Sequence, residues 1–185
     1  MHDGTDSPDG QAPQAAIVFK DACVKRGGRV IWRHGSFSIP SGSVTAIVGT
    51  NGAGKTTMMK AELGLIDTMA GSITVLGKPA GAMNQHIGYV PQSYAVDIES
   101  NLTAEQSVLL GLTGTRFGIH PVTRAQREKA RKAMEFVGLL DKASYRLSEL
   151  SGGLRQRAAI AQALVSDPQL LMLDEPLANL DLASQ

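Results

Sequence analysis

Cysteine and long apolar runs are both scarce in this sequence, and each scarcity removes a class of protein. The 185 residues include a single cysteine, Cys23, so an internal disulfide and a cysteine-rich metal cage are both excluded. No uninterrupted apolar run reaches about 18 residues, the length that would span a bilayer. We therefore expect Cys23 to be a buried, inert thiol in a reducing compartment, and any membrane crossing to belong to another chain.

An excess of charge of one sign is also missing. Lysine and arginine number 18 against 17 acidic residues, so no overall field attracts nucleic acid or anionic lipid. At 43% hydrophobic residues, the chain can bury a real core in one or two compact units. Residues 1–14 are polar and lack the basic start and apolar segment of a signal peptide, so we expect a disordered tail.

The remaining residues, 15–185, contain strand patterns first and helix patterns later. Two strands are predicted on either side of a turn at Gly27 and Gly28, and "SVTAIV" (43–48) is predicted to be a strand buried on both faces. A helical region follows at about 100–160, and "LLML" (170–173) again suits a buried strand. This order predicts an α/β core with a helical subdomain. Further strands are expected within 71–79 and 86–92, and helices within 102–112, 123–140 and 151–167.

A glycine-rich segment, "GTNGAGKT" (49–56), matches the pattern of a phosphate-binding loop between a predicted strand and a helix. Glycines let successive backbone N–H groups face phosphate oxygens, Lys55 supplies a mobile positive charge, and Thr56 offers a hydroxyl to Mg²⁺. The alternative is a flexible glycine turn before an ordinary helix. The predicted phosphate ligands are Gly49, Thr50, Asn51, Gly52, Ala53, Gly54, Lys55, Thr56 and Thr57.

Two adjacent carboxylates, Asp174 and Glu175, follow the last predicted strand. Ligands of open α/β sheets bind at the carboxyl ends of strands, where Asp174 could orient Mg²⁺ and Glu175 could hold or deprotonate the attacking water. Alone, the pair is equally typical of a helix start with acids in its first turn. A phosphate loop in the same chain favours the catalytic interpretation.

A third segment, "LSGGLRQR" (150–157), places Ser151 as the N-cap of a helix whose first N–H groups could face an anion. Together, "GTNGAGKTT", "YVPQ", "LSGGLRQR", "LLMLDEP" and "NLD" resemble the nucleotide-binding subunit of ATP-binding cassette (ABC) transporters. The resemblance implies a P-loop NTPase fold with an N-terminal β-rich part, a RecA-like core and a helical subdomain. It also implies that ATP and Mg²⁺ are the ligands.

By this resemblance, two subunits pack head to tail, as a homodimer or pseudo-dimer. Ser151, Gly152 and Gly153 of each subunit would then cap the ATP held by the other. Gln92 would contact Mg²⁺ or the attacking water, and residues 179–181 would cross the dimer interface. Leu154 replaces the family's glutamine, and Arg26 stands where the family usually has an aromatic residue that stacks on adenine. Arg26 could stack on the base or simply be a solvated turn residue.

The resemblance extends to partners and location. It implies transmembrane permease subunits, an extracytoplasmic substrate-binding protein, and a cytoplasmic position at the inner face of the cell membrane. "IGYVPQ" with "NLTAEQSVLLG" is similar to the manganese, zinc and iron importers, while an exporter, a regulatory module and a non-transport ABC-type ATPase stay open. None of the four histidines stands at the family's switch position, so we expect a C-terminally truncated cassette with weak hydrolysis.

Overall fold

The structure is a computed structural model that describes residues 14–92, 101–114 and 121–174. It divides into two compact units, residues 1–83 and 84–185, and each is described by itself. Among the described helices, none has the length and apolar character needed to cross a membrane.

The first unit begins with a β-hairpin. Strands β1 (Ala15–Arg26) and β2 (Arg29–Pro40) pair antiparallel, as the sequence predicts. Gly27 and Gly28 connect them with φ angles of 54° and 82°, a left-handed pair that matches the twist of a two-residue hairpin. The predicted glycine turn is therefore confirmed.

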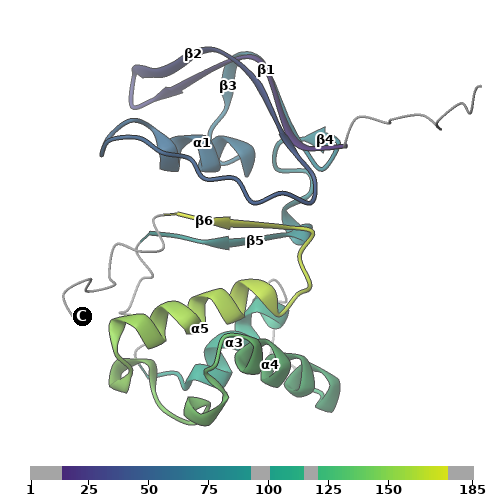
Figure 1. The fold of residues 1–185 in the computed structure, drawn as a ribbon, viewed down its shortest axis with the longest axis vertical. Coiled ribbons are helices and arrows are strands. Elements are labelled where there is room, and N and C mark those ends of the chain that lie inside the picture. The colour runs from purple at the N-terminus through teal and green to yellow at the C-terminus, as the bar shows by residue number, and fades with distance from the viewer. Residues whose placement is uncertain (1–13, 93–100, 115–120, 175–185) are drawn as a thin grey trace, which may run out of the picture. The chain divides into compact units, whose positions relative to one another are not determined.

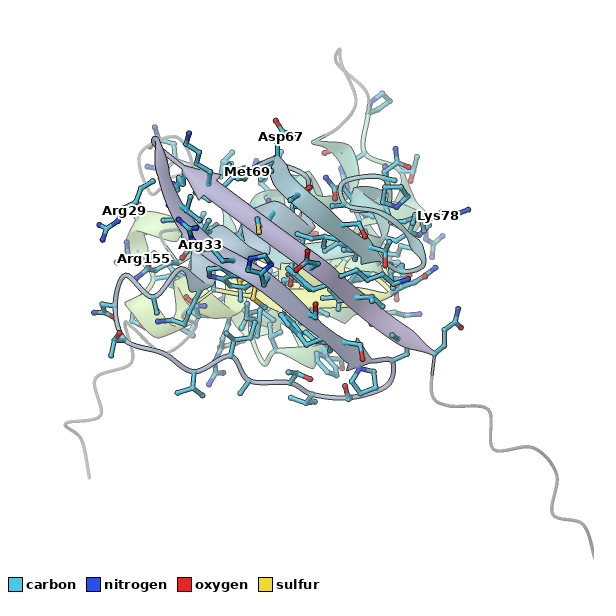
Figure 2. The ribbon with its side chains drawn as sticks, turned by 90° about the horizontal axis from the view of Figure 1, so that it is seen from above. Arg29, Arg33, Asp67, Met69, Lys78 and Arg155 are labelled. Carbon is cyan, nitrogen blue, oxygen red and sulfur yellow. The ribbon has the colours of Figure 1, made fainter. Side chains whose placement is uncertain are left out.

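Two further strands complete an antiparallel sheet. β3 (Thr68–Val75) pairs with β1, and the short β4 (Lys78–Pro79) pairs with β3, giving the order β2-β1-β3-β4. Helix α1 (Lys55–Glu62) lies against one face of this sheet (Figure 1). Arg29 and Arg33 project from β2 as exposed side chains (Figure 2). Residues buried in this unit include Ile17, Phe19, Val24, Met58, Ala61, Ile73 and Val75.

The predicted strand at 43–48 is wrong. The segment has no regular secondary structure, and Val44 and Val48 are fully exposed, at 103% and 93% of the reference area. A strand that is buried on both faces forms only where neighbouring strands pair with its backbone, and the four-stranded sheet does not include this segment. The local composition favoured a strand, but strand formation also requires a partner strand.

The second unit contains a parallel pair of strands. β5 (Ile87–Val90) and β6 (Leu170–Leu173) run in register, with Ile87 opposite Leu170 and Val90 opposite Leu173. Both strands were predicted from sequence. A 3₁₀ turn, η1 (Asn84–His86), precedes β5.

Helices form the rest of this unit. α3 (Ala104–Thr113) and α4 (Arg124–Phe136) each begin with a complete capping box, and α5 (Gly152–Leu164) packs on β5 (Figure 1). Two short 3₁₀ turns, η2 (Leu140–Lys142) and η3 (Leu147–Glu149), lie between α4 and α5. The helices share one apolar core that includes Val108, Leu109, Ala130, Met134, Leu139, Leu147, Leu150, Ala158, Ala161 and Val165.

Candidate functional site

The phosphate loop is a tight turn that leads directly into α1. The Ala53 N–H donates to the Thr50 carbonyl at 3.1 Å, and Gly52 and Gly54 have φ angles of 85° and 96°. Gly54 is the N-cap of α1 and offers no side chain to cap the helix. The first N–H groups of α1 therefore have no partner within the helix, which makes this end suitable for an anion.

Lys55 lies folded over the loop. Its Nζ donates to the Gly49 carbonyl at 2.8 Å and to the Thr50 carbonyl at 3.2 Å. A single ammonium group thus closes the loop and holds a positive charge at its rim.

Strand β2 forms a wall behind Gly54. A Cβ atom at this position would lie 2.6 Å from Ile31 Cγ2 and 2.8 Å from Trp32 Nε1, closer than real Cβ contacts occur. Only glycine fits this place, because the left-handed φ angle adds a second penalty for any side chain. The sequence predicts the need for glycine here but gives no sign of the contact with β2.

Arg26 lies at the end of β1 with an exposed side chain, opposite Arg29 across the hairpin. Exposure suits both stacking on a base and simple solvation. The role of Arg26 therefore stays a prediction.

Asp174 lies directly after β6 and is buried, with 2% of its reference area exposed. Its backbone N–H donates to the Val90 carbonyl at 2.9 Å, which fixes the residue at the end of the parallel pair. The Tyr89 hydroxyl donates a long hydrogen bond to Asp174 Oδ2 at 3.4 Å. Burial raises the pKa of the Tyr89 hydroxyl, and the Asp174 charge and this hydrogen bond act in the same direction.

Tyr89 is a neighbour of the carboxylate that sequence reasoning missed. The sequence did contain a clue to this contact, because Tyr89 belongs to the motif "YVPQ". In the structure, the parallel register places Tyr89 opposite Met172, two residues before Asp174. Gln92 follows β5 and is exposed. Parallel strands end at the same edge of a sheet, so Gln92 and Asp174 both follow the carboxyl edge of the β5–β6 pair.

The helix behind the third segment begins as predicted. Ser151 is the N-cap of α5, and its Oγ accepts a hydrogen bond from the Leu154 N–H at 3.4 Å. Gly152 and Gly153 form the start of the first turn, where backbone N–H groups lack partners within the helix. Leu154 packs against the apolar core of the helices, so its side chain makes no polar contact in place of glutamine.

The structure thus groups the predicted residues in two sets. Residues 49–57 share the loop and first turn of α1 in the first unit, while Gln92, Asp174 and residues 151–153 belong to the second. Glu175 and residues 179–181 lie outside the described residues. His, Cys, Asp and Glu form no metal-binding cluster of three or more within the ranges that the structure describes.

Comparison with known proteins places this arrangement among ATP-binding cassettes. The family described as "ABC transporter" matches residues 33–178. A "Probable metal transport system ATP-binding protein" of Chlamydia muridarum is 37% identical over 169 residues, which is 91% of this chain and 65% of the relative. The "Zinc transport system ATP-binding protein TroB" of Treponema pallidum is 40% identical over 147 residues, or 80% of this chain and 55% of the relative.

A solved structure agrees with the fold. The structure of cbiO1 from Clostridium perfringens, described as part of the ABC transporter complex cbiONQ, gives a TM-score of 0.77 at 28% identity. The match covers 90% of this chain and 68% of that one. The predicted α/β fold of a P-loop NTPase is therefore confirmed. The chain spans less than two thirds of the length of both curated relatives.

Proposed function

The chain belongs to the ABC transporter family, and from this membership we propose that it is the ATP-binding and ATP-hydrolysing subunit of an ABC membrane transporter for metal-ion import. The observation that carries the proposal is the phosphate loop, in which Lys55 lies over the carbonyls of Gly49 and Thr50. An uncapped helix start with a positive charge at its rim suits the β and γ phosphates of a nucleotide.

Magnesium fits the donors that the chain offers. Thr56, Gln92 and Asp174 each provide a hard oxygen, and Mg²⁺ prefers a few such protein ligands together with phosphate oxygens and water. Asp174 is the strongest of these ligands because it is a buried carboxylate fixed at a strand end. When bound, Mg²⁺ would neutralise charge that develops on the phosphates.

Hydrolysis requires a group that orients or deprotonates water. Glu175, next to the fixed Asp174, is proposed for this role, and Gln92 is proposed to contact the same water or Mg²⁺. The signature residues Ser151, Gly152 and Gly153 are proposed to act in trans on the γ phosphate held by a second subunit. The exposure of Ser151 and Gly152 at the start of α5 supports this, because a partner must reach their N–H groups, whereas Gly153 is half-buried.

Partners and location follow from the same proposal. We infer a homodimer or pseudo-dimer of ATPase subunits attached to transmembrane permease subunits, with an extracytoplasmic substrate-binding protein on the other side. The chain itself would be peripheral, at the inner face of the membrane.

The cargo is the part of the proposal that depends on relatives. Proteins named for metal, zinc and manganese transport are 37%, 40% and 37% identical. Relatives named for phosphonate import and Nod factor export are 39% identical. The ATPase assignment therefore does not depend on which ion or molecule is moved.

Binding of MgATP to the 185-residue chain tests the proposal directly. Lys55→Ala removes the charge at the loop rim, and we expect most of the affinity to be lost while the thermal unfolding of the second unit stays the same. ATP turnover should rise when metal-importer permease subunits are added to the wild type. Equal MgATP affinity in wild type and Lys55→Ala would refute the proposed site. If no permease subunit changed the rate of ATP turnover, a regulatory role would be favoured.

A further inference from the structure

The turn of the β1–β2 hairpin concentrates positive charge that the chain as a whole lacks. Four exposed cations, which we call the basic hairpin, stand between positions 25 and 33: Lys25, Arg26, Arg29 and Arg33. Residues 22–61, which contain this turn and the phosphate loop, include six lysine and arginine residues and no aspartate or glutamate. Because the whole chain has 18 basic and 17 acidic residues, the remainder is net negative, so the charge of the chain is strongly polarised.

The four charges of the basic hairpin are not neutralised by the part of the chain that the structure describes. Within those ranges, none of the four cations forms an ion pair. Asp21, the nearest acidic residue on the hairpin, contacts His34 instead, with 2.7 Å between Oδ1 and Nδ1. Arg26 and Arg29 are also direct partners across the hairpin, where like charges repel each other. The basic hairpin therefore presents an uncompensated positive charge to any anion that approaches it.

The phosphate loop lies close to these charges. A Cβ atom on Gly54 would be 2.6 Å from Ile31 Cγ2 and 2.8 Å from Trp32 Nε1, so β2 touches the loop at these two residues. Arg29 and Arg33 are within two residues of this contact along β2. Because a strand rises about 3.3 Å per residue, their charges lie within roughly 15 Å of the loop. The hairpin turn and the segment before α1 also lie at the same end of the first unit (Figure 1).

We propose that the basic hairpin is an electrostatic guide, which attracts the polyphosphate of a nucleotide towards loop 49–56 and raises the rate at which it binds. The inference rests on the proposed function, because it concerns the same ligand and the same loop. A nucleotide is the anion that this place favours, since the adjacent segment has the glycine pattern and the lysine of a phosphate-binding loop. The field of the cations acts through water over several ångströms, so it requires no hydrogen bond to the phosphates and no particular side-chain orientation.

The double variant Arg29→Gln/Arg33→Gln tests this role and leaves Arg26, with its separate predicted stacking on the base, unchanged. The probe is MgATP that carries a fluorescent methylanthraniloyl group, mixed with the 185-residue chain in a stopped-flow instrument. Trp32 is the single tryptophan and lies beside Gly54, so energy transfer from its indole reports the arrival of the nucleotide. At 10 mM ionic strength the association rate should fall by about twofold per arginine, and by about fourfold in the double variant. The dissociation rate should change much less, because charges that do not touch the ligand act mainly on association.

Two controls separate the effect of charge from other effects of substitution. Lys78→Gln removes the same charge as either single arginine variant, but from β4, at the opposite edge of the sheet from β2. Figure 2 shows Lys78 on the opposite side of the first unit from Arg29 and Arg33, so this variant should bind at nearly the wild-type rate. Arg29→Lys/Arg33→Lys keeps both charges and should also keep the rate, because the field depends on charge and not on the guanidinium group.

Salt distinguishes guidance by a field from a direct contact. At 0.5 M ionic strength the Debye length is about 4 Å, so the difference between the double variant and wild type should almost disappear. Failure of the wild type to bind the labelled MgATP at either ionic strength would overturn the proposed function itself. Wild-type binding with an equal association rate in the double variant at 10 mM would overturn only the role of the basic hairpin. A deficit that persisted at 0.5 M, or that Lys78→Gln shared, would overturn this role as well, because the position of the charges would then not be its cause.

Discussion

Replacement of Glu62 measures how much stability the chain loses by burying a carboxyl group. Glu62 is in the last turn of α1, one turn after the buried Met58, and only 1% of it is exposed. Its Oε1 atom is buried and has no hydrogen-bond partner among the described residues. Burial raises the pKa of the Glu62 carboxyl from 4.5 to about 8.

The sign of the effect follows from proton linkage. The unfolded chain releases this proton near pH 4.5, whereas the folded chain keeps it up to about pH 8. Between these values the folded chain binds one proton at Glu62 that the unfolded chain has released. Folding must therefore take up a proton, so the free energy of unfolding falls as pH rises. The contribution of Glu62 to the free energy of unfolding is fully present below pH 4.5, declines from there to about pH 8, and is constant above.

The magnitude comes from the size of the pKa shift. One pKa unit corresponds to about 1.4 kcal/mol, so the unfolding free energy should fall by about 2.5 kcal/mol between pH 5 and pH 7 through this group alone. Glu62→Gln keeps the shape and carries no titrating proton. The difference in unfolding free energy between Glu62→Gln and wild type should therefore grow by that amount over the same interval.

Urea denaturation at pH 5, 6, 7 and 8, followed by circular dichroism, gives the required free energies. Asp67→Asn is the control, because Asp67 is an exposed carboxylate of the same unit (Figure 2). It should keep the wild-type dependence on pH. If Glu62→Gln and wild type gave parallel stability curves from pH 5 to 8, the burial argument would be wrong.

The remaining predictions concern hydrolysis and helix packing. Glu175→Gln should bind MgATP normally yet hydrolyse it at least about a hundredfold more slowly, because a general base contributes at least that much to the rate. Unchanged turnover in a phosphate-release assay would show that Glu175 is not the group that activates water. Gly111→Ala should destabilise the second unit by about 1–3 kcal/mol in urea, because its Cβ would overlap the Gln162 carbonyl of α5. Gly35→Ala, whose nearest contact is an ordinary 3.5 Å, should be close to neutral, and equal effects of the two would contradict the packing argument.

Local signals were sufficient to predict much of this fold. Thr103 and Thr123 each stand three residues before a glutamine, and both form the reciprocal hydrogen bonds of a capping box. Gly27 and Gly28 likewise determine their turn through their own backbone freedom. In each case the interacting atoms are within a few residues in sequence, so the pattern contains the whole interaction.

Features that depend on distant residues could not be predicted in this way. Segment 43–48 has the composition of a strand, but strand formation depends on edges offered elsewhere in the chain. The contact of Trp32 with Gly54 and the hydrogen bond from Tyr89 to Asp174 both join separate elements. Glu62 is a partial exception, because helical spacing from Met58 already puts it on the buried face of α1.

Leu154 bears on the proposal that the start of α5 binds an anion without the family's glutamine. Its side chain packs into the helical core, while its N–H donates to Ser151 Oγ. One residue thus anchors the first turn from both the backbone and the side chain. Because Leu154 offers no polar side-chain atom, the proposed phosphate recognition there would depend on Ser151 and on the backbone N–H groups of Gly152 and Gly153. In this proposal Leu154 acts by holding the first turn in place, and we expect a polar replacement, which would leave the apolar core, to loosen that turn.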